Sequence, residues 1–91
     1  MRRAARTDAN HAEIVQALRK VGCRVLDLRS LGNGCPDLLV DTGSGLALME
    51  VKTSDGHLRQ SQQDFVSAGW RVWVIRSVPD ALKVVWSYRL E

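Results

Sequence analysis

The stretch Gly34-Cys35-Pro36-Asp37-Leu38-Leu39-Val40, followed after a short connection by Leu46-Ala47-Leu48-Met49-Glu50-Val51-Lys52, decides the fold of this chain. The connection, Asp41-Thr42-Gly43-Ser44-Gly45, consists of residues that favour turns. Two apolar runs on either side of such a turn predict neighbouring strands over Cys35–Val40 and Leu46–Lys52.

Polar side chains interrupt the two predicted strands at Asp37, Glu50 and Lys52. Side chains alternate along a strand, so Glu50 and Lys52 share one face, and Asp37 on the neighbouring strand can lie beside them. Two carboxylates and an ammonium group on one side of a sheet are costly unless something binds there. Mg²⁺ fits, because it takes one or two carboxylates together with substrate phosphate. An ordinary salt bridge from Lys52 to Glu50 or Asp37 is the alternative.

Hydrophobic periodicity predicts five further elements around these strands. They are a helix from Thr7–Asn10 to about Val21, a strand over Cys23–Leu28, a helix over Ser61–Ala68, a strand over Trp70–Ile75 and a final helix opened by Pro79. Both faces of the strand over Trp70–Ile75 are rather apolar, which predicts an interior strand covered on both sides. A β-meander followed by a right-handed β-α-β crossover gives an α/β domain with a mixed four-stranded sheet flanked by helices.

The bulk composition limits the class of protein. A length of 91 residues with 45% hydrophobic content predicts one domain with a small core, over residues 7–91, preceded by a mobile basic arm over residues 1–6. No apolar run is long enough to span a bilayer, and no apolar segment of a secretory signal follows the arm, so we expect a soluble, cytoplasmic protein without membrane contact. The net charge of +3 suits a polyanionic partner without identifying one.

Cys23 and Cys35 are expected to be reduced thiols, since nothing in their context indicates oxidation. A zinc site that joins them to His11 and His57 is disfavoured, because paired CxxC or HxxxH spacing is absent from the sequence.

Several short motifs occur in an order that resembles a known nuclease signature. Pro36-Asp37, twelve intervening residues and Glu50-Val51-Lys52 resemble the PD-(D/E)xK pattern. Together with Asn33–Leu38 and the later Leu58-x-x-x-Gln62-x-x-Phe65, they resemble the stand-alone form of the VRR-NUC (virus-type replication-repair nuclease) family. The resemblance runs from about Glu13 to Leu82 and implies an αβββαβ core, here with an extra C-terminal helix.

The resemblance also implies a function and a set of site residues. It implies a metal-dependent endonuclease that hydrolyses DNA phosphodiester bonds, with Mg²⁺ as cofactor and Mn²⁺ also supporting activity. The substrate would be branched DNA such as Holliday junctions, cut by a homodimer in replication, repair or recombination, in a phage or prophage setting. Asp37, Glu50, the Val51 carbonyl and Glu13 would bind the metal, Lys52 would act on the attacking water, and Gln62 would hold a phosphate oxygen or that water. The expected DNA contacts are Arg2, Arg3, Arg6, Arg29 and Arg59.

Other interpretations of the same residues stay open. Asn10-His11-Ala12-Glu13 has the form of a capping box, in which Glu13 only bonds the helix start. Gln62 can likewise make a helix-start hydrogen bond. Trp70, Trp73 and Trp86 are either core residues or part of a dimer interface. The whole domain can instead be a non-catalytic nucleic-acid-binding module, or a protein-interaction domain with ordinary salt bridges.

Overall fold

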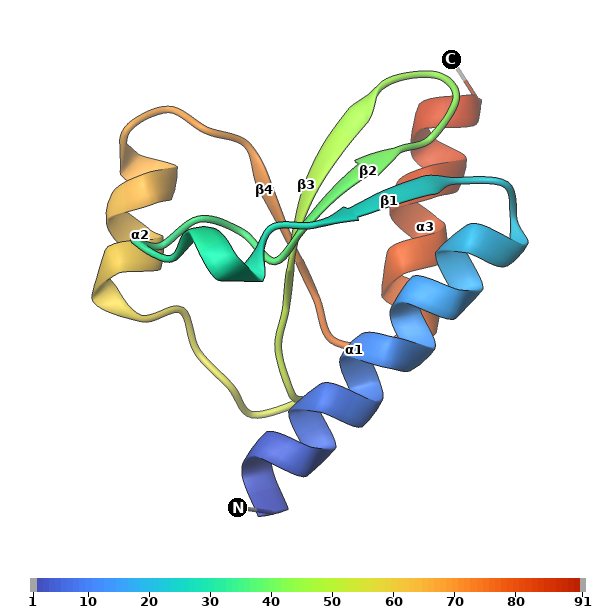
Figure 1. The fold of residues 1–91 in the computed structure, drawn as a ribbon. Coiled ribbons are helices and arrows are strands. Elements are labelled where there is room, and N and C mark those ends of the chain that lie inside the picture. The colour runs from blue at the N-terminus through green and yellow to red at the C-terminus, as the bar shows by residue number, and fades with distance from the viewer. Residues whose placement is uncertain (1, 91) are drawn as a thin grey trace.

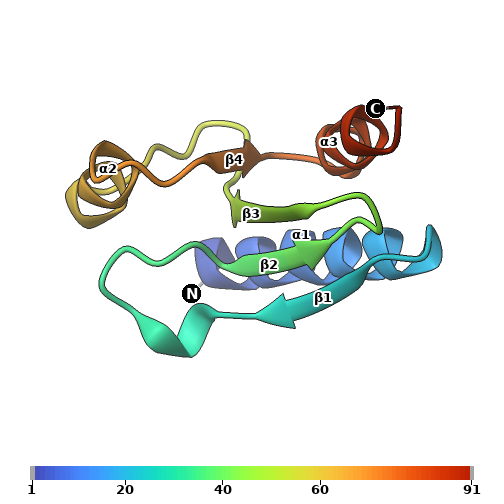
Figure 2. The ribbon, with the colours of Figure 1, turned by 90° about the horizontal axis from the view of Figure 1, so that it is seen from above.

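Within the part of the chain that the structure describes, four short strands form one mixed sheet. The computed structural model describes the backbone of residues 2–90 and the side chains of residues 9–90. The strands are β1 (Arg24–Asp27), β2 (Leu38–Asp41), β3 (Leu46–Val51) and β4 (Val72–Ile75), and their order across the sheet is β1-β2-β3-β4. The first three strands are antiparallel, and β4 runs parallel to β3. Figure 2 shows the four strands in this succession. The predicted meander and the mixed four-stranded sheet are thereby confirmed.

Among the described residues, three α-helices lie around the sheet. They are α1 (Arg2–Lys20), α2 (Gln60–Ser67) and α3 (Val78–Arg89), and a short 3-10 helix, η1 (Arg29–Leu31), follows β1. Figure 1 shows the sheet nearly edge-on, with α1 and α3 on one side and α2 on the other. The two sides therefore differ: one receives two long helices, and the other receives a single short helix.

Helix α1 begins at Arg2, earlier than the expected start between Thr7 and Asn10. The backbone of residues 2–6, expected to be a mobile arm, is thus part of this helix, consistent with the high helix propensity of alanine and arginine there. The DNA contacts predicted for Arg2, Arg3 and Arg6 concern side chains outside the described residues.

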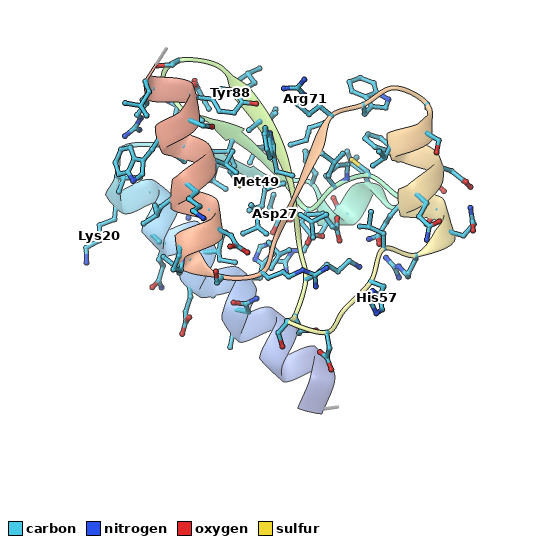
Figure 3. The ribbon with its side chains drawn as sticks, turned by 180° about the vertical axis from the view of Figure 1, so that it is seen from behind. Lys20, Asp27, Met49, His57, Arg71 and Tyr88 are labelled. Atoms are coloured by element: carbon cyan, nitrogen blue, oxygen red, sulfur yellow. The ribbon has the colours of Figure 1, made fainter. Side chains whose placement is uncertain are left out.

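The core lies between the sheet and the pair α1 and α3. Alternate residues of the strands point into it, as the period of two requires. The core contains Ile14, Leu18, Cys23, Leu38, Val40, Ala47, Met49, Val51, Ile75, Ala81, Val84 and Val85. Figure 3 shows Met49 between the sheet and these two helices. The core is small, as expected for a domain of this length.

The prediction that the fourth strand is interior is wrong. Among the described strands, β4 pairs only with β3 and forms an edge of the sheet. Trp73 on one side of β4 contacts Tyr88 of α3, with the ring centroids 6.4 Å apart. Apolar residues on both sides of this strand therefore do not report how many strands lie beside it.

Among the described helices, none has both the length and the apolar character needed to cross a membrane.

Candidate active site

Asp37 and Glu50 face each other across β2 and β3. The register pairs Leu38 with Met49, and continuing it by one residue sets Asp37 opposite Glu50. The backbone N–H of Val51 donates a hydrogen bond of 2.9 Å to Asp37 Oδ2. The end of β3 therefore holds the Asp37 carboxylate in place beside Glu50.

The Glu50 carboxylate is buried, with only 4% of the residue exposed, and its two oxygens differ in their surroundings. Gln62 Nε2 donates to Oε2 over 2.8 Å, and Lys52 Nζ lies 3.6 Å from the same oxygen. Oε1 is buried and has no hydrogen-bond partner among the described residues. A buried carboxylate oxygen without a partner is costly, so Oε1 is positioned to accept an external ligand.

Burial raises the pKa of Glu50 above its usual range, and the nearby charge of Asp37 raises it further. Lys52 opposes this shift without cancelling it. A carboxylate in such surroundings is stabilised by a proton or by a cation, because either one compensates the desolvated negative charge.

Gln62 makes the helix-start hydrogen bond that was one of its two predicted roles, and it also bonds Glu50. Its Oε1 accepts a 2.8 Å hydrogen bond from the backbone N–H of Arg59 at the start of α2, while its Nε2 bonds Glu50. The capping bond fixes the side chain, so the amide reaches the site from a rigid helix end. The predicted inward orientation of Gln62 is confirmed by its burial.

A close approach of backbone to backbone brings Asp37 and Gln62 to the same place. Gly34 adopts φ +80°, and a Cβ added there would collide with the backbone carbonyl of Ser61 at the start of α2. The N–H of Leu28 also donates to the carbonyl of Asp37 over 2.7 Å. These contacts seat the connection before β2 against both α2 and the end of β1.

The structure does not bring Glu13 into contact with the other predicted site residues. Glu13 lies exposed on α1, in a hollow it shares with Gln16, Lys20 and Val78. Helix α1 packs on the face of the sheet that Met49 and Val51 occupy, whereas Glu50 points to the opposite face. The capping-box alternative also fails, because α1 begins at Arg2 and the segment from residue 10 is interior to the helix.

The remaining donors fit a magnesium-like ion. Among the described residues, no three His, Cys, Asp or Glu side chains converge on one point. The predicted ligands Asp37, Glu50 and the carbonyl of Val51 would offer oxygen atoms, and Mg²⁺ commonly keeps waters at its other positions. The partnerless Oε1 of Glu50 agrees with this donor set. Cys23 and Cys35 form no disulfide in the structure.

No family model and no curated protein matches the chain. Membership of the VRR-NUC family therefore stays a prediction, carried by the motifs and by the site they form.

Two residues that sequence reasoning missed hold Lys52 and the segment after it. Asn10 Nδ2 donates to the backbone carbonyls of Lys52 and Arg76, over 3.3 and 3.4 Å. Arg76 Nη1 donates to the carbonyls of Thr53 and Gly56, over 2.7 Å each. No sequence signal could have found them, because their acceptors are backbone atoms that every residue carries.

The two described arginines that were predicted to contact DNA lie in different surroundings. Arg29 forms a forked ion pair with Asp27, with an N–O distance of 2.8 Å. The hydrogen bonds from Arg29 lower the pKa of Asp27 to about 2. Arg59 is exposed at the start of α2. Of these two arginines, Arg59 is the one that forms no ion pair with a carboxylate among the described pairs. A contact of Arg59 with DNA would therefore not require an existing ion pair to break.

Proposed function

We propose that this protein is a metal-dependent endonuclease that hydrolyses DNA phosphodiester bonds. The observation that supports the proposal is the pairing of Asp37 with the buried Glu50, with one partnerless Glu50 oxygen and the Lys52 ammonium group on the same face. A salt bridge alone does not account for this arrangement, because Lys52 contacts Oε2 and leaves Oε1 without a partner.

In the proposed site Asp37, Glu50 and the Val51 carbonyl would hold Mg²⁺ or Mn²⁺. A divalent cation at such a site lowers the pKa of a bound water and offsets negative charge on the phosphate. Lys52, whose side chain is 15% exposed, orients the attacking water or stabilises charge that develops on the phosphate oxygens. Gln62 positions Glu50 through its 2.8 Å hydrogen bond, and it does not need to touch the phosphate itself.

The substrate belongs to the same proposal. A net charge of +3 and the exposed Arg59 favour a polyanion. The motif resemblance favours branched DNA, and symmetric incision of a four-way junction requires two active sites and hence a twofold dimer. A non-catalytic nucleic-acid-binding module is the second candidate, and it would bind DNA without the metal.

Cleavage of labelled DNA tests the proposal. Purified protein is incubated with a four-way junction, a flap and a linear duplex, in Mg²⁺, in Mn²⁺ and in EDTA. We expect metal-dependent cleavage that favours a branched substrate. Binding of DNA without cleavage in either metal would instead support the non-catalytic module.

Lys52→Ala is expected to reduce cleavage at least about a hundredfold, the effect of losing an electrostatic or proton-transfer group in an active site. Lys83→Ala is the matched control, because Lys83 is an exposed lysine on α3, on the other side of the sheet. Both variants should still gain thermal stability on addition of Mg²⁺. Normal cleavage by Lys52→Ala would remove Lys52 from the mechanism.

A further inference from the structure

Trp70, at the connection between α2 and β4, is a large aromatic residue that the rest of the domain leaves accessible. It is 57% exposed, and its ring stacks on Phe65 of α2 with the centroids 5.4 Å apart and the planes at 19°. Figure 3 shows the adjacent Arg71 at this connection. We call Phe65 and Trp70 the aromatic platform. Phe65 holds one face of the indole ring while more than half of the residue stays accessible, so the platform is rigid and open to a ligand.

The aromatic platform lies on the side of the sheet that carries the candidate site. Glu50 pairs with Val74 of β4, so these two side chains leave the same side of the sheet. Figure 1 shows α2 on that side, opposite α1 and α3. Gln62 of α2 bonds Glu50, and Phe65 follows Gln62 by about one turn of the same helix. The platform is therefore the next aromatic surface along α2 from the site.

Strand geometry limits the distance between the platform and the site. Trp70 precedes Val74 by four residues, which span at most about 14 Å when fully extended. Val74 is the direct neighbour of Glu50 in the sheet. Each nucleotide advances a duplex strand by about 3.4 Å, and an unpaired strand can extend further. A strand with a phosphate at the candidate site therefore reaches the platform within about four nucleotides.

The charges around the platform favour nucleic acid as its ligand. Unpaired DNA is bound by cations that contact its phosphates and by aromatic faces on which its bases stack. Lys52 lies at the site, and Arg59 at the start of α2 and Arg71 beside Trp70 are both exposed. The single acidic residue of α2, Asp64, accepts a 2.8 Å hydrogen bond from Gln60. Cations thus lie at both ends of the path from the site to the platform.

We propose that the aromatic platform stacks an unpaired nucleobase of the DNA strand whose phosphodiester bond lies at the candidate site. The faces of a base inside a duplex are covered by its neighbours, and exposing them costs free energy. The platform therefore favours DNA that is unpaired within a few nucleotides of the bond to be cut. The inference rests on the proposed function for its choice of DNA as ligand, and it assigns Trp70 to substrate selection and not to the chemical step.

Binding without metal tests the inference separately from cleavage. The full chain in EDTA is titrated into a labelled duplex with a single-stranded tail and into the blunt duplex of the same sequence. We expect the wild type to bind the tailed duplex more tightly, with quenching of its tryptophan fluorescence. Trp70→Ala should lose at least about tenfold in affinity for the tailed duplex and keep its affinity for the blunt one. Trp70→Phe keeps an aromatic face and should recover most of the loss.

Trp86→Ala is the matched control. Trp86 is a 45% exposed tryptophan on α3, on the other side of the sheet, with Arg89 Cζ 5.3 Å from its ring centroid. This variant should bind both duplexes as the wild type does. In Mg²⁺, Trp70→Ala should raise KM for the tailed duplex at least about tenfold and leave kcat within about twofold, because Trp70 does not touch the reacting atoms. Circular dichroism and a cooperative melt confirm that each variant folds.

Three results would overturn the inference. One is a wild type that binds the two duplexes equally or binds neither. Another is Trp70→Ala with wild-type affinity for the tailed duplex, and a lower mass of this variant in light scattering would then assign the platform to a protein interface. The third is an equal loss of affinity for both duplexes, which would make Trp70 a contact to paired DNA.

The failure of this inference and that of the proposed function are distinguishable. Binding that depends on Trp70, without cleavage in Mg²⁺ or Mn²⁺, would refute the nuclease and leave the platform standing. Metal-dependent cleavage that Trp70→Ala leaves unchanged would refute the platform alone.

Discussion

Glu50 makes the stability of the metal-free protein depend on pH. Its pKa is raised in the folded state above the ordinary value of 4.5, chiefly by burial. The folded protein therefore binds this proton more tightly than the unfolded chain does. The contribution of Glu50 to stability is fully present below pH 4.5 and is lost as the pH rises through the raised pKa.

Glu50→Gln should therefore stabilise the metal-free protein at neutral pH, with a melting temperature higher by a few degrees. The same variant should lose the thermal shift that Mg²⁺ gives the wild type, because a ligand oxygen has become part of a neutral amide. Differential scanning fluorimetry at pH 4 and pH 7.5, with and without Mg²⁺, measures both effects. If Glu50→Gln is less stable than wild type at pH 7.5 without metal, then the ionised Glu50 side chain does not destabilise the folded protein at this pH.

The variant Glu13→Gln tests whether Glu13 binds the metal, as the sequence predicts, or lies away from the site, as in the structure. The sequence prediction makes Glu13 a metal ligand, whereas the structure places it exposed on α1, which packs on the opposite face of the sheet. We expect Glu13→Gln to cleave within about twofold of wild type, while Glu50→Gln loses at least about a hundredfold. Comparable losses in both variants would mean that Glu13 joins the site when DNA binds.

For single residues, the sequence predicted that Asp37, Glu50 and Lys52 share one side of the sheet, and the structure places them there. Asp37, Glu50 and Lys52 were found because strand alternation and register are regular, and both follow from the sequence pattern. Glu13 was misplaced in the prediction because a helical position does not say which side of the sheet the helix covers. The partnerless state of Glu50 Oε1 could not have been predicted, since it depends on which oxygen Gln62 and Lys52 reach.

Between the elements, one arginine fixes the connection that follows the candidate site. Arg76, directly after β4, bonds the carbonyls of Thr53 and Gly56 in the connection from β3 to α2. It also donates its backbone N–H to Asp80 in the first turn of α3. The ends of both parallel strands are thus tied together beside Lys52.

Arg76→Met should loosen this connection without disturbing the metal ligands. The lost hydrogen bonds from a charged donor should cost about 2 kcal/mol of folding free energy. Amide hydrogen exchange over residues 53–56 should accelerate and kcat should fall, while the Mg²⁺-induced thermal shift persists. Arg71→Met, an exposed arginine at the start of the same strand, is the control. Unchanged exchange over residues 53–56 would contradict the role assigned to Arg76.

The elements themselves were largely predictable, and their arrangement less so. The predicted order of helices and strands is observed, because amphipathic period and turn residues are local properties. The position of β4 at the edge was not foreseen, since strand neighbours are set by the whole sheet. The start of α1 was also missed, because the polar arm lacks the apolar stripe on which the prediction relied.

For the whole molecule, the twofold dimer of the proposed function predicts that stability depends on protein concentration. A homodimer gains stability by mass action, so its melting temperature should rise by several degrees between about 1 and 100 µM protein. A wild-type melting temperature that is constant over this range would contradict a dimer formed on folding.

The exposure of two tryptophans also belongs to this scale. From the sequence, Trp70, Trp73 and Trp86 could each be either a core residue or part of a dimer interface. Trp70 and Trp86 are 57% and 45% exposed, so neither is a core residue, while Trp73 is half-buried against Tyr88. Aromatic content alone could not decide this, because burial depends on which side of the sheet the helices leave open.

The missing side chain at Gly34 makes the candidate site vulnerable to a mutation that removes none of its functional groups. Any other residue at this position would meet the first turn of α2 and also carry an unfavourable positive φ. In a saturation mutagenesis screen for activity, position 34 should therefore tolerate substitution as poorly as the acidic positions do. The adjacent Asn33, which already adopts φ 56° with its own side chain in place, should accept replacement by glycine.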